Sequence, residues 1–384
     1  MGFKKIIYFM LSMIKESSQN ALERFFMKNG EYIHMSQQAF SEARQKIKWE
    51  AFREMFDFSA TVHYRNTEAI RWNGLRIWGI DGSKLLLPAD ELLRKYFGTS
   101  GPHGKSPTAQ ASILYDILND LVVDALIEPM KNGEQAQAWT HINHLTGIET
   151  FQQWQELVIF DRGYPSWELI HGLLERKIHY LMRVRAKFST EADALDFGEH
   201  MIELKRGKER LSVRVIKLLL SSGETEILFT SLMDAKYGVE DFKALYFMRW
   251  PIETKYDILK KKLEIENFSG RLVDNIRQDF YATMVLTNLA ADFFWAAQAE
   301  VENEYEQKEN KYHYQVNLNH AIGVLKDLLI KTLLEEDGKK RGEMFDKIMW
   351  LLKKRLIPKR PGRSLPRNPF PRNAKFHHNH KSNC

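Results

Sequence analysis

The chain has 384 residues, of which 44% are hydrophobic and 12% aromatic, enough for two or three packed domains. Its only cysteine is Cys384, which excludes a disulfide-stabilised secreted scaffold and is consistent with the reducing cytoplasm. The formal charge of +6 permits a polyanionic partner without identifying one, and no run reaches the roughly 18 apolar residues of a membrane span.

The N-terminal region, residues 1–70, is predicted to be helical. Ser12 and Lys15 break its first apolar run and no small-residue cleavage site follows, so we expect no secretory signal. Over residues 36–56 apolar side chains recur at helical spacing, and Ser36 is placed to cap the first turn. Other faces of this helix carry the cations Arg44, Lys46, Lys48 and Arg53. They fit either a DNA-binding helical unit or an ordinary solvated helix.

Short apolar runs with helical segments between them fill residues 71–185. Asn119 and Asp120 separate two of the runs at the spacing of a tight turn, which predicts a hairpin. Helical patterns occupy residues 134–145 and 166–177. The runs are at residues 75–81, 111–117, 121–129, 157–161 and 179–185. This order of elements predicts an α/β fold with a mixed sheet.

A β-rich insertion is predicted at residues 186–237, where the runs 210–220 and 225–232 have the composition of strands. Helices are expected to resume near Val239.

The C-terminal part divides by composition into three segments. Residues 238–300 are helical and are expected to complete the fold, and residues 301–355 add further helices. From Lys353 onward the chain has Lys and Arg but no Asp or Glu, and residues 356–384 are rich in Pro and Arg. We expect this last segment to be an extended or disordered basic tail.

Two aspartates each close a predicted buried strand. Asp81 ends the first run and is followed by Gly82, and Asp161 ends the fourth run and is followed by Arg162 and Gly163. Acids in such places lie at the rim of a sheet, where open α/β folds bind ligands. Either aspartate alone would be read as a turn residue, but their matched surroundings favour a shared site.

A helical stretch at residues 246–263 carries a polar stripe and, offset by one residue, an apolar one. Spacings of 3, 4 and 7 place the polar residues Tyr246, Arg249, Glu253 and Lys260 on one helix face. Pro251 is expected to kink this helix or to mark a restart, because it has no N–H to donate. The apolar stripe is expected to pack on the sheet, with the polar stripe facing its rim. An amphipathic helix with incidental ion pairs is the alternative.

Together, Asp81, Asp161 and Glu253 provide the carboxylates that phosphoryl transfer uses. Two divalent ions about 3.5–4 Å apart can hold the attacking and leaving oxygens of such a reaction. Mg²⁺ suits carboxylate ligands, and neighbouring Arg and Lys side chains suit a phosphate backbone.

The spacing Tyr246-x2-Arg249-x3-Glu253-x6-Lys260 resembles the Tyr-Arg-Glu-Lys signature of insertion-sequence transposases of family four. The IDGS and DRGY runs that contain Asp81 and Asp161 resemble that family's two aspartate motifs. The resemblance covers residues 35–270, and the stretch 359–367 is similar to a tail seen in relatives. It implies an RNase H-like core in which two Mg²⁺ or Mn²⁺ ions are bound by the three acids.

The resemblance also implies a function, namely cleavage at the ends of an insertion sequence and joining of the freed 3′ ends to target DNA. The partners would be terminal inverted repeats and target DNA, with a homodimer assembled on them in the bacterial cytoplasm at the nucleoid. Phosphate contacts are expected from Tyr246, Arg249, Lys260 and Arg162. Trp250 is either a base-stacking side chain or a core residue.

Two other functions remain open at this point. The chain is also compatible with a catalytically inactive or domesticated DNA-binding protein of the same fold, or with a metal-dependent nuclease that does not join strands. His141 and His144 share a helix face, as two metal ligands would, but no third ligand is nearby and we interpret both as structural.

Overall fold

The computed structural model divides the chain into two compact units. The first comprises Met1–Ser59, Leu259–Ser269 and Gln278–Cys384, and the second comprises Ala60–Ile258 and Gly270–Arg277. The structure describes residues 2–12, 18–28, 30, 35–100, 106–147, 155–220, 223–305 and 312–358.

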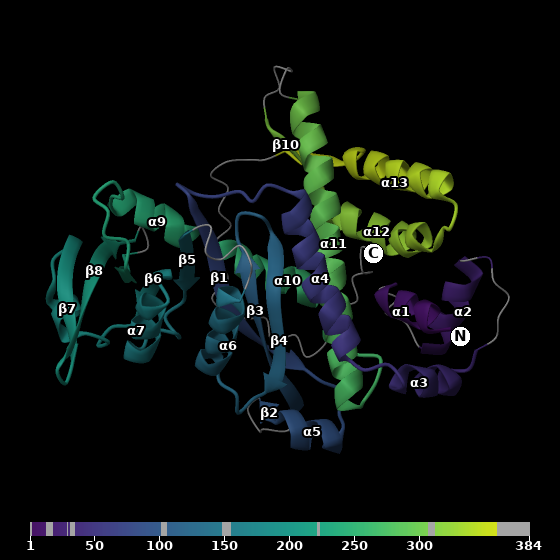
Figure 1. Cartoon of the computed structure of the whole chain (residues 1–384), viewed down its shortest axis with the longest axis horizontal. Helices are drawn as coiled ribbons and strands as arrows, with labels where there is room; N and C mark the ends of the chain where they lie inside the picture. The colour runs from purple at the N-terminus through teal and green to yellow at the C-terminus, as the bar shows by residue number, and fades with distance from the viewer. Residues whose placement is uncertain are drawn as a thin grey trace. The chain divides into compact units, whose positions relative to one another are not determined.

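The second unit is built on one large mixed sheet. Within the described residues it has nine strands in the order β2-β3-β1-β5-β6-β9-β8-β7, with β4 paired to β3. The strands are β1 (Leu75–Leu86), β2 (Thr99–Ser100), β3 (Ser106–Asp116), β4 (Leu121–Pro129), β5 (Gln155–Phe160), β6 (His179–Val184), β7 (Gly198–Arg206), β8 (Glu209–Leu219) and β9 (Thr225–Thr230). In Figure 1, β7 and β8 lie at the opposite end of this sheet from β3 and β4.

Strand directions in this sheet confirm the predicted mixed α/β class. β1 is antiparallel to β3 but parallel to β5, and β5 is parallel to β6. Between β3 and β4 lies the expected hairpin, where Asp120 adopts a φ of 53°. Its short side chain is one of the few that tolerate this left-handed conformation.

The β-rich segment extends the same sheet. β9 runs antiparallel to β6, with Leu181 opposite Thr230, and β8 and β7 follow outward. β7 was not predicted, because most of its residues are partly or fully exposed and only Ile202 is buried, which leaves a weak alternation.

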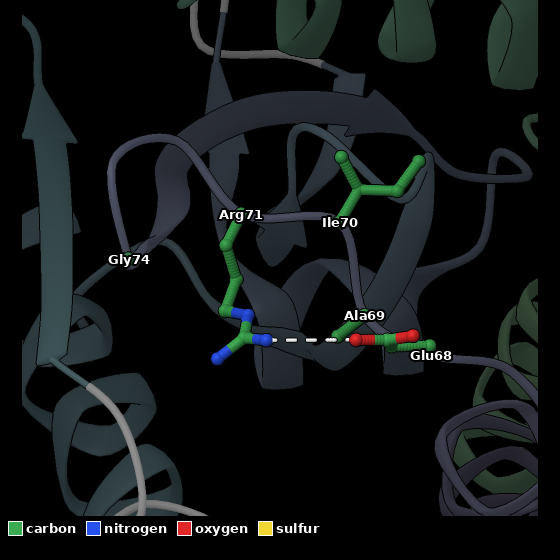
Figure 2. A pocket seen from close by; sticks show the side chains of 5 residues that line it. All are labelled: Glu68, Ala69, Ile70, Arg71 and Gly74. Atoms are coloured by element: carbon green, nitrogen blue, oxygen red, sulfur yellow. Dashed lines mark ion pairs between the residues drawn. The ribbon is translucent and has the colours of Figure 1, made fainter.

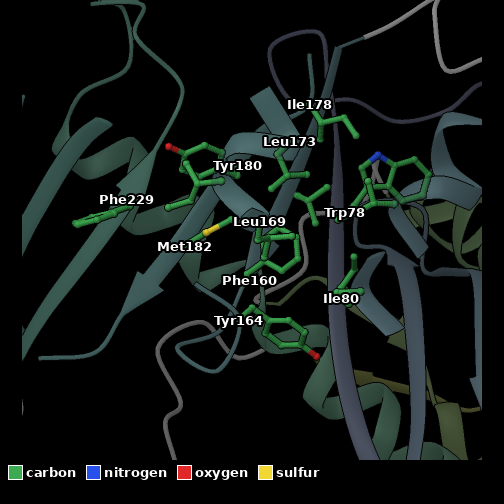
Figure 3. Close-up of a cluster of buried hydrophobic side chains, with 14 of the residues drawn as sticks. Trp78, Ile80, Phe160, Tyr164, Leu169, Leu173, Ile178, Tyr180, Met182 and Phe229 are labelled. Atoms are coloured by element: carbon green, nitrogen blue, oxygen red, sulfur yellow. The ribbon is translucent and has the colours of Figure 1, made fainter. Parts of the chain in front are cut away.

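Two faces of the sheet are covered by different helices. Trp78, Ile80 and Phe160 belong to a buried cluster on one face (Figure 3), and this cluster includes side chains of α6 (Glu134–Thr146) and α7 (Trp167–Glu175). On the other face, Ile252 of α10 (Trp250–Lys261) approaches Gly79 of β1. The unit also contains α5 (Glu91–Phe97), α8 (Thr190–Ala194) and α9 (Val239–Phe247).

The first unit is mainly helical. It contains α1 (Phe3–Leu11), α2 (Ser18–Lys28), α3 (Gln37–Gln45), α12 (Leu318–Leu334), α13 (Gly338–Lys353) and most of α11 (Val273–Tyr305). α4 (Glu50–Asn66) has residues in both units, as do α10 and α11. No helix in the described ranges is long and apolar enough to cross a membrane.

The predicted helix at residues 36–56 is divided into α3 and α4, which corrects that expectation. Ser36 does cap α3, since its side chain accepts a hydrogen bond from Ala39 N–H at 3.1 Å. Arg44, predicted on an outer face, is instead 2% exposed and pairs with Asp279 at 2.8 Å. A buried guanidinium needs such a partner, so Arg44 belongs to the packed interior of the first unit and is not exposed for contact with DNA.

Part of the predicted basic tail is ordered. Residues Leu356–Pro358 form β11, which pairs antiparallel with β10 (Tyr314–Val316) of the first unit. The stretch 359–384, which includes the tail motif at 359–367, lies outside the described residues.

Candidate active site

Strand register brings the two predicted aspartates to the same place. β1 and β5 pair in parallel, with Gly79 opposite Ile159 as the last pair, and Asp81 and Asp161 each follow that pair by two residues. Paired residues of β1 and β5 differ by 80 in sequence number, which is also the separation of the two aspartates in the sequence. Side chains of a strand alternate between its two faces, so Asp81 shares the face of Gly79, which α10 covers.

The helical stretch that carries the glutamate is two helices with a turn between them. α9 ends at Phe247 and α10 begins at Trp250, so Pro251 falls in the first turn of a new helix. Proline is tolerated there because the first N–H groups of a helix have no partner within it. The predicted restart at Pro251 is confirmed.

Glycine at position 79 allows α10 to lie close to β1. A Cβ added to Gly79 would be 3.2 Å from the Cδ1 atom of Ile252, tighter than most real contacts. Ile252 and Leu259 are fully buried, so the predicted apolar stripe does pack.

Each of the three acids makes a hydrogen bond or an ion pair with another residue. Tyr246 donates a hydrogen bond from its hydroxyl to Asp161 Oδ1 at 3.2 Å, and Arg249 Nη2 pairs with Glu253 Oε1. Asp81 Oδ1 accepts the Gly82 N–H at 3.0 Å. These contacts pair Tyr246 with Asp161 and Arg249 with Glu253. Asp161 directly follows β5 as predicted, but Asp81 lies inside β1, which continues to Leu86, so the prediction that Asp81 closes its strand is wrong.

Burial and the charges of neighbouring groups affect the protonation of Asp81 and Tyr246. Burial raises the pKa of Asp81 to about 6, and the negative charges of Asp161 and Glu253 add to this effect. Arg249 and the Gly82 N–H oppose it. Burial, reinforced by the charge of Asp161, also raises the pKa of the Tyr246 hydroxyl, which therefore stays protonated and able to donate.

A buried polar network holds the backbone of Asp81. Its carbonyl oxygen accepts hydrogen bonds from the hydroxyls of Tyr256 at 2.9 Å and Ser112 at 3.2 Å. The Ser112 hydroxyl also contacts His141, with Ser112 Oγ 3.0 Å from His141 Nε2. On the other side of the ring, His141 Nδ1 lies 2.7 Å from Asp124 Oδ2.

This Ser112-His141-Asp124 series has the residue types of a hydrolytic triad, but all three side chains are buried and cannot reach a substrate. The structural interpretation of His141 is confirmed. Ser112 and Asp124 were missed, because each lies within an apolar strand pattern and gives no signal of its own.

The other residues predicted to contact DNA differ in their exposure and location. Trp250 is 49% exposed, so the alternative that it is a core residue is wrong. Phe247, just before the turn, is 75% exposed and was not predicted. Arg162 is exposed beside Asp161. Lys260 lies on the last turn of α10 and belongs to the first unit, so its role as a DNA contact stays a prediction.

The candidate site offers carboxylate oxygens, which are the ligands that hard divalent cations bind. Within the described ranges, no three Asp, Glu, His or Cys side chains converge as they would around a metal ion. Glu253 is turned to Arg249 and Asp161 to Tyr246 instead. Carboxylates are nevertheless the ligands that Mg²⁺ and Mn²⁺ prefer, and a bound cation would offset the burial of Asp81, which is the main cause of its raised pKa.

A pocket elsewhere in the second unit is separate from these acids. It is formed by the segment that precedes β1, and an ion pair of 3.6 Å joins Arg71 and Glu68 within it (Figure 2). Its lining residues are Glu68, Ala69, Ile70, Arg71 and Gly74, and none belongs to the candidate site.

Comparison with known proteins identifies the family. The family model described as "Transposase DDE domain" matches residues 80–289, more than half of the chain and a range that contains all three acids. A relative from Escherichia coli (strain K12), the transposase InsG for insertion sequence element IS4, is 25% identical over 270 residues. The match covers 65% of this chain and only 59% of that relative's length.

A solved structure with similarity to the chain is the piggyBac transposase synaptic complex with hairpin DNA, at 12% identity and a TM-score of 0.47. That match covers 94% of this chain and 76% of the other. Such a distant likeness supports no statement about function, and the assignment rests on the family model together with the IS4 relative. The chain belongs to the transposases with a DDE domain, as its motifs predicted.

Proposed function

We propose that the chain is a DNA transposase that cleaves the ends of its insertion sequence and joins them to target DNA by two-metal phosphoryl transfer. The observation that carries this proposal is the parallel pairing of β1 with β5 in the register that leads to Asp81 and Asp161, in a sheet against which the helix of Glu253 packs. Membership of the DDE transposase family supports DNA as the substrate.

Asp81, Asp161 and Glu253 would hold the divalent ions. Bound Mg²⁺ or Mn²⁺ would supply Lewis-acid stabilisation of the phosphoryl oxygens and lower the pKa of an attacking hydroxyl or water. To bind a metal ion, the Glu253 carboxylate would have to release its ion pair with Arg249. The buried network behind Asp81 would keep its strand fixed while the carboxylate changes partners.

The cationic and aromatic side chains around the acids would bind the DNA. Once released from Glu253, Arg249 has a planar set of donors that matches a phosphate group. Tyr246 offers a protonated hydroxyl, and Arg162 and Lys260 would add phosphate contacts. Trp250 is exposed enough to stack on a base displaced at the cleaved end. We further propose that two copies assemble on the terminal repeats.

Cleavage of the DNA that flanks the gene, in Mg²⁺ or Mn²⁺, tests the proposal. Wild type should cut at a defined end, and Glu253→Gln should bind that DNA but not cut it. Glu240→Gln, which removes an exposed carboxylate from α9, is the matched control and should cut normally. Cutting by Glu253→Gln would contradict the assignment of the site. Cutting by wild type without any joined product would favour a nuclease.

A further inference from the structure

A buried lysine ties the helix that carries Glu253 to the sheet. Lys255 of α10 is 5% exposed, and its Nζ atom lies 2.5 Å from Asp120 Oδ1. Asp120 belongs to the turn between β3 and β4, where it adopts a φ of 53°. A buried ammonium group needs a counter-charge, so this ion pair anchors α10 to that turn.

Tyr115 of β3 contacts both members of the ion pair. Its hydroxyl donates a hydrogen bond to Asp120 Oδ1, and Lys255 Nζ lies 5.2 Å from the centre of its ring. Tyr115 is 2% exposed and pairs across the strands with Gly79, the residue that Ile252 approaches closely. Directly opposite residues of paired strands share a face of the sheet. The ion pair and the apolar contact of α10 therefore lie side by side on β3 and β1.

Two polar contacts of α10 flank its apolar contact. Around the helix axis, Lys255 lies about 60° to one side of Ile252 and Tyr256 about 40° to the other. Tyr256 donates its hydrogen bond to the Asp81 carbonyl oxygen at 2.9 Å, while Lys255 reaches the β3–β4 turn. Apolar packing is non-directional and would by itself let the helix roll on the sheet. Polar contacts on opposite sides of Ile252 oppose such a roll.

Glu253 extends from the same turn of α10, about 100° around the axis from Ile252, so a roll of the helix moves its carboxylate. At a radius of about 5–6 Å, that of a helix with its side chains, a roll of about 10° displaces this group by about 1 Å. We propose that Lys255 is a positioning residue, whose ion pair with Asp120 fixes α10 on the sheet and sets the direction of Glu253. This inference rests on the proposed function, because it concerns a carboxylate that the reaction uses.

A pair of variants separates positioning from simple neutralisation of charge. Lys255→Met leaves the partly buried Asp120 carboxylate without its cation and should lower the midpoint of thermal unfolding. Adding Asp120→Asn removes the uncompensated charge and keeps a side chain that tolerates the left-handed conformation. The double variant should therefore recover much of the wild-type unfolding temperature. If Lys255 served only to neutralise Asp120, the double variant would also cleave DNA normally.

Cleavage of end DNA, at saturating DNA and Mn²⁺, should be slower than wild type in both Lys255→Met and the double variant. A displacement of about 1 Å can slow a reaction about a hundredfold, so we expect a loss of at least about tenfold, with the Kd for DNA unchanged. Lys243→Met is the matched control, because its ion pair with Glu240 at 3.5 Å is exposed, and it should cleave as wild type does. Wild-type cleavage by the double variant would overturn the inference.

Amide hydrogen exchange over residues 252–258 tests the anchor without DNA or metal. Contacts between charged groups commonly contribute enough local stability for exchange in the double variant to be at least about tenfold faster, with exchange in α6 unchanged. If wild type does not cut DNA, the proposed function is overturned and exchange alone decides the inference. Faster exchange over residues 252–258 would then support Lys255 as the anchor of α10, and unchanged exchange would overturn it in either case.

Discussion

Replacement of Asp81 by asparagine should stabilise the metal-free protein at neutral pH. Burial and neighbouring charge raise the pKa of this carboxyl from its ordinary 3.8 to about 6. That difference corresponds to about 3 kcal/mol of unfavourable free energy for the ionised form in the folded state. Asparagine has nearly the same shape and no charge, so Asp81→Asn removes this cost.

The effect should depend on pH in a defined direction. The folded-state pKa lies above the unfolded one, so the carboxyl is neutral in both states below about pH 3.8 and its ionisation costs nothing there. The cost grows as the pH rises from about 4 and is complete above about 6. The free energy of unfolding of Asp81→Asn relative to wild type should therefore increase by about 3 kcal/mol between pH 4 and pH 7.

Urea unfolding in EDTA at several pH values between 4 and 7.5 measures this difference directly. Each variant is compared with wild type at the same pH, so the titration of other groups cancels to first order. Added Mn²⁺ should then stabilise wild type and leave Asp81→Asn unchanged, because a ligand stabilises only the state that binds it. A stability difference that is the same at pH 4 and pH 7 would refute the account of a desolvated carboxylate crowded by two others.

Three further substitutions test the parts around the acids. Ser112→Ala should lower the free energy of unfolding, measured in urea, by about 1–3 kcal/mol, because it leaves His141 buried without one partner. An unchanged free energy of unfolding would contradict a structural role for this hydrogen-bond network. Gly79→Ala should cost about 1–3 kcal/mol through its contact with Ile252, and Ile252→Val, which removes the contacting Cδ1, should recover part of the loss on the Gly79→Ala background; no recovery would contradict the close approach. Arg249→Gln should weaken binding to end DNA and reduce the salt dependence by about one counterion; an unchanged salt slope would contradict a phosphate contact there.

Much of the sheet could be predicted because its strands contain short apolar runs, although β1 continues beyond its run to Leu86 and β3 begins before its run, at Ser106. Runs of that kind located β1, β3, β4, β5 and β6, and the turn residues located the hairpin. A single sequence does not show the register of paired strands, because strand pairing depends on contacts between segments that are distant in the chain. That Asp81 and Asp161 each follow the paired residues Gly79 and Ile159 by two positions is known only from the pairing of β1 with β5 in the structure.

The side chains that sequence reasoning missed are those whose local pattern looks ordinary. Arg44 reads as one of several surface cations, and only its pairing with Asp279 shows that it is buried. Asp124 lies inside an apolar run and becomes interpretable through its contact with His141.

Mapping the cation site by Fe²⁺-dependent cleavage of the protein backbone tests the central claim most directly. With added hydrogen peroxide and ascorbate, Fe²⁺ bound in place of Mg²⁺ reduces the peroxide to hydroxyl radicals that cut the chain near the ligands, and the fragments show where the ion was bound. The account predicts cuts close to residues 81, 161 and 253, suppressed by excess Mg²⁺ and absent in Asp81→Asn. Cuts elsewhere, or cuts at these positions that persist in Asp81→Asn, would contradict a shared carboxylate site.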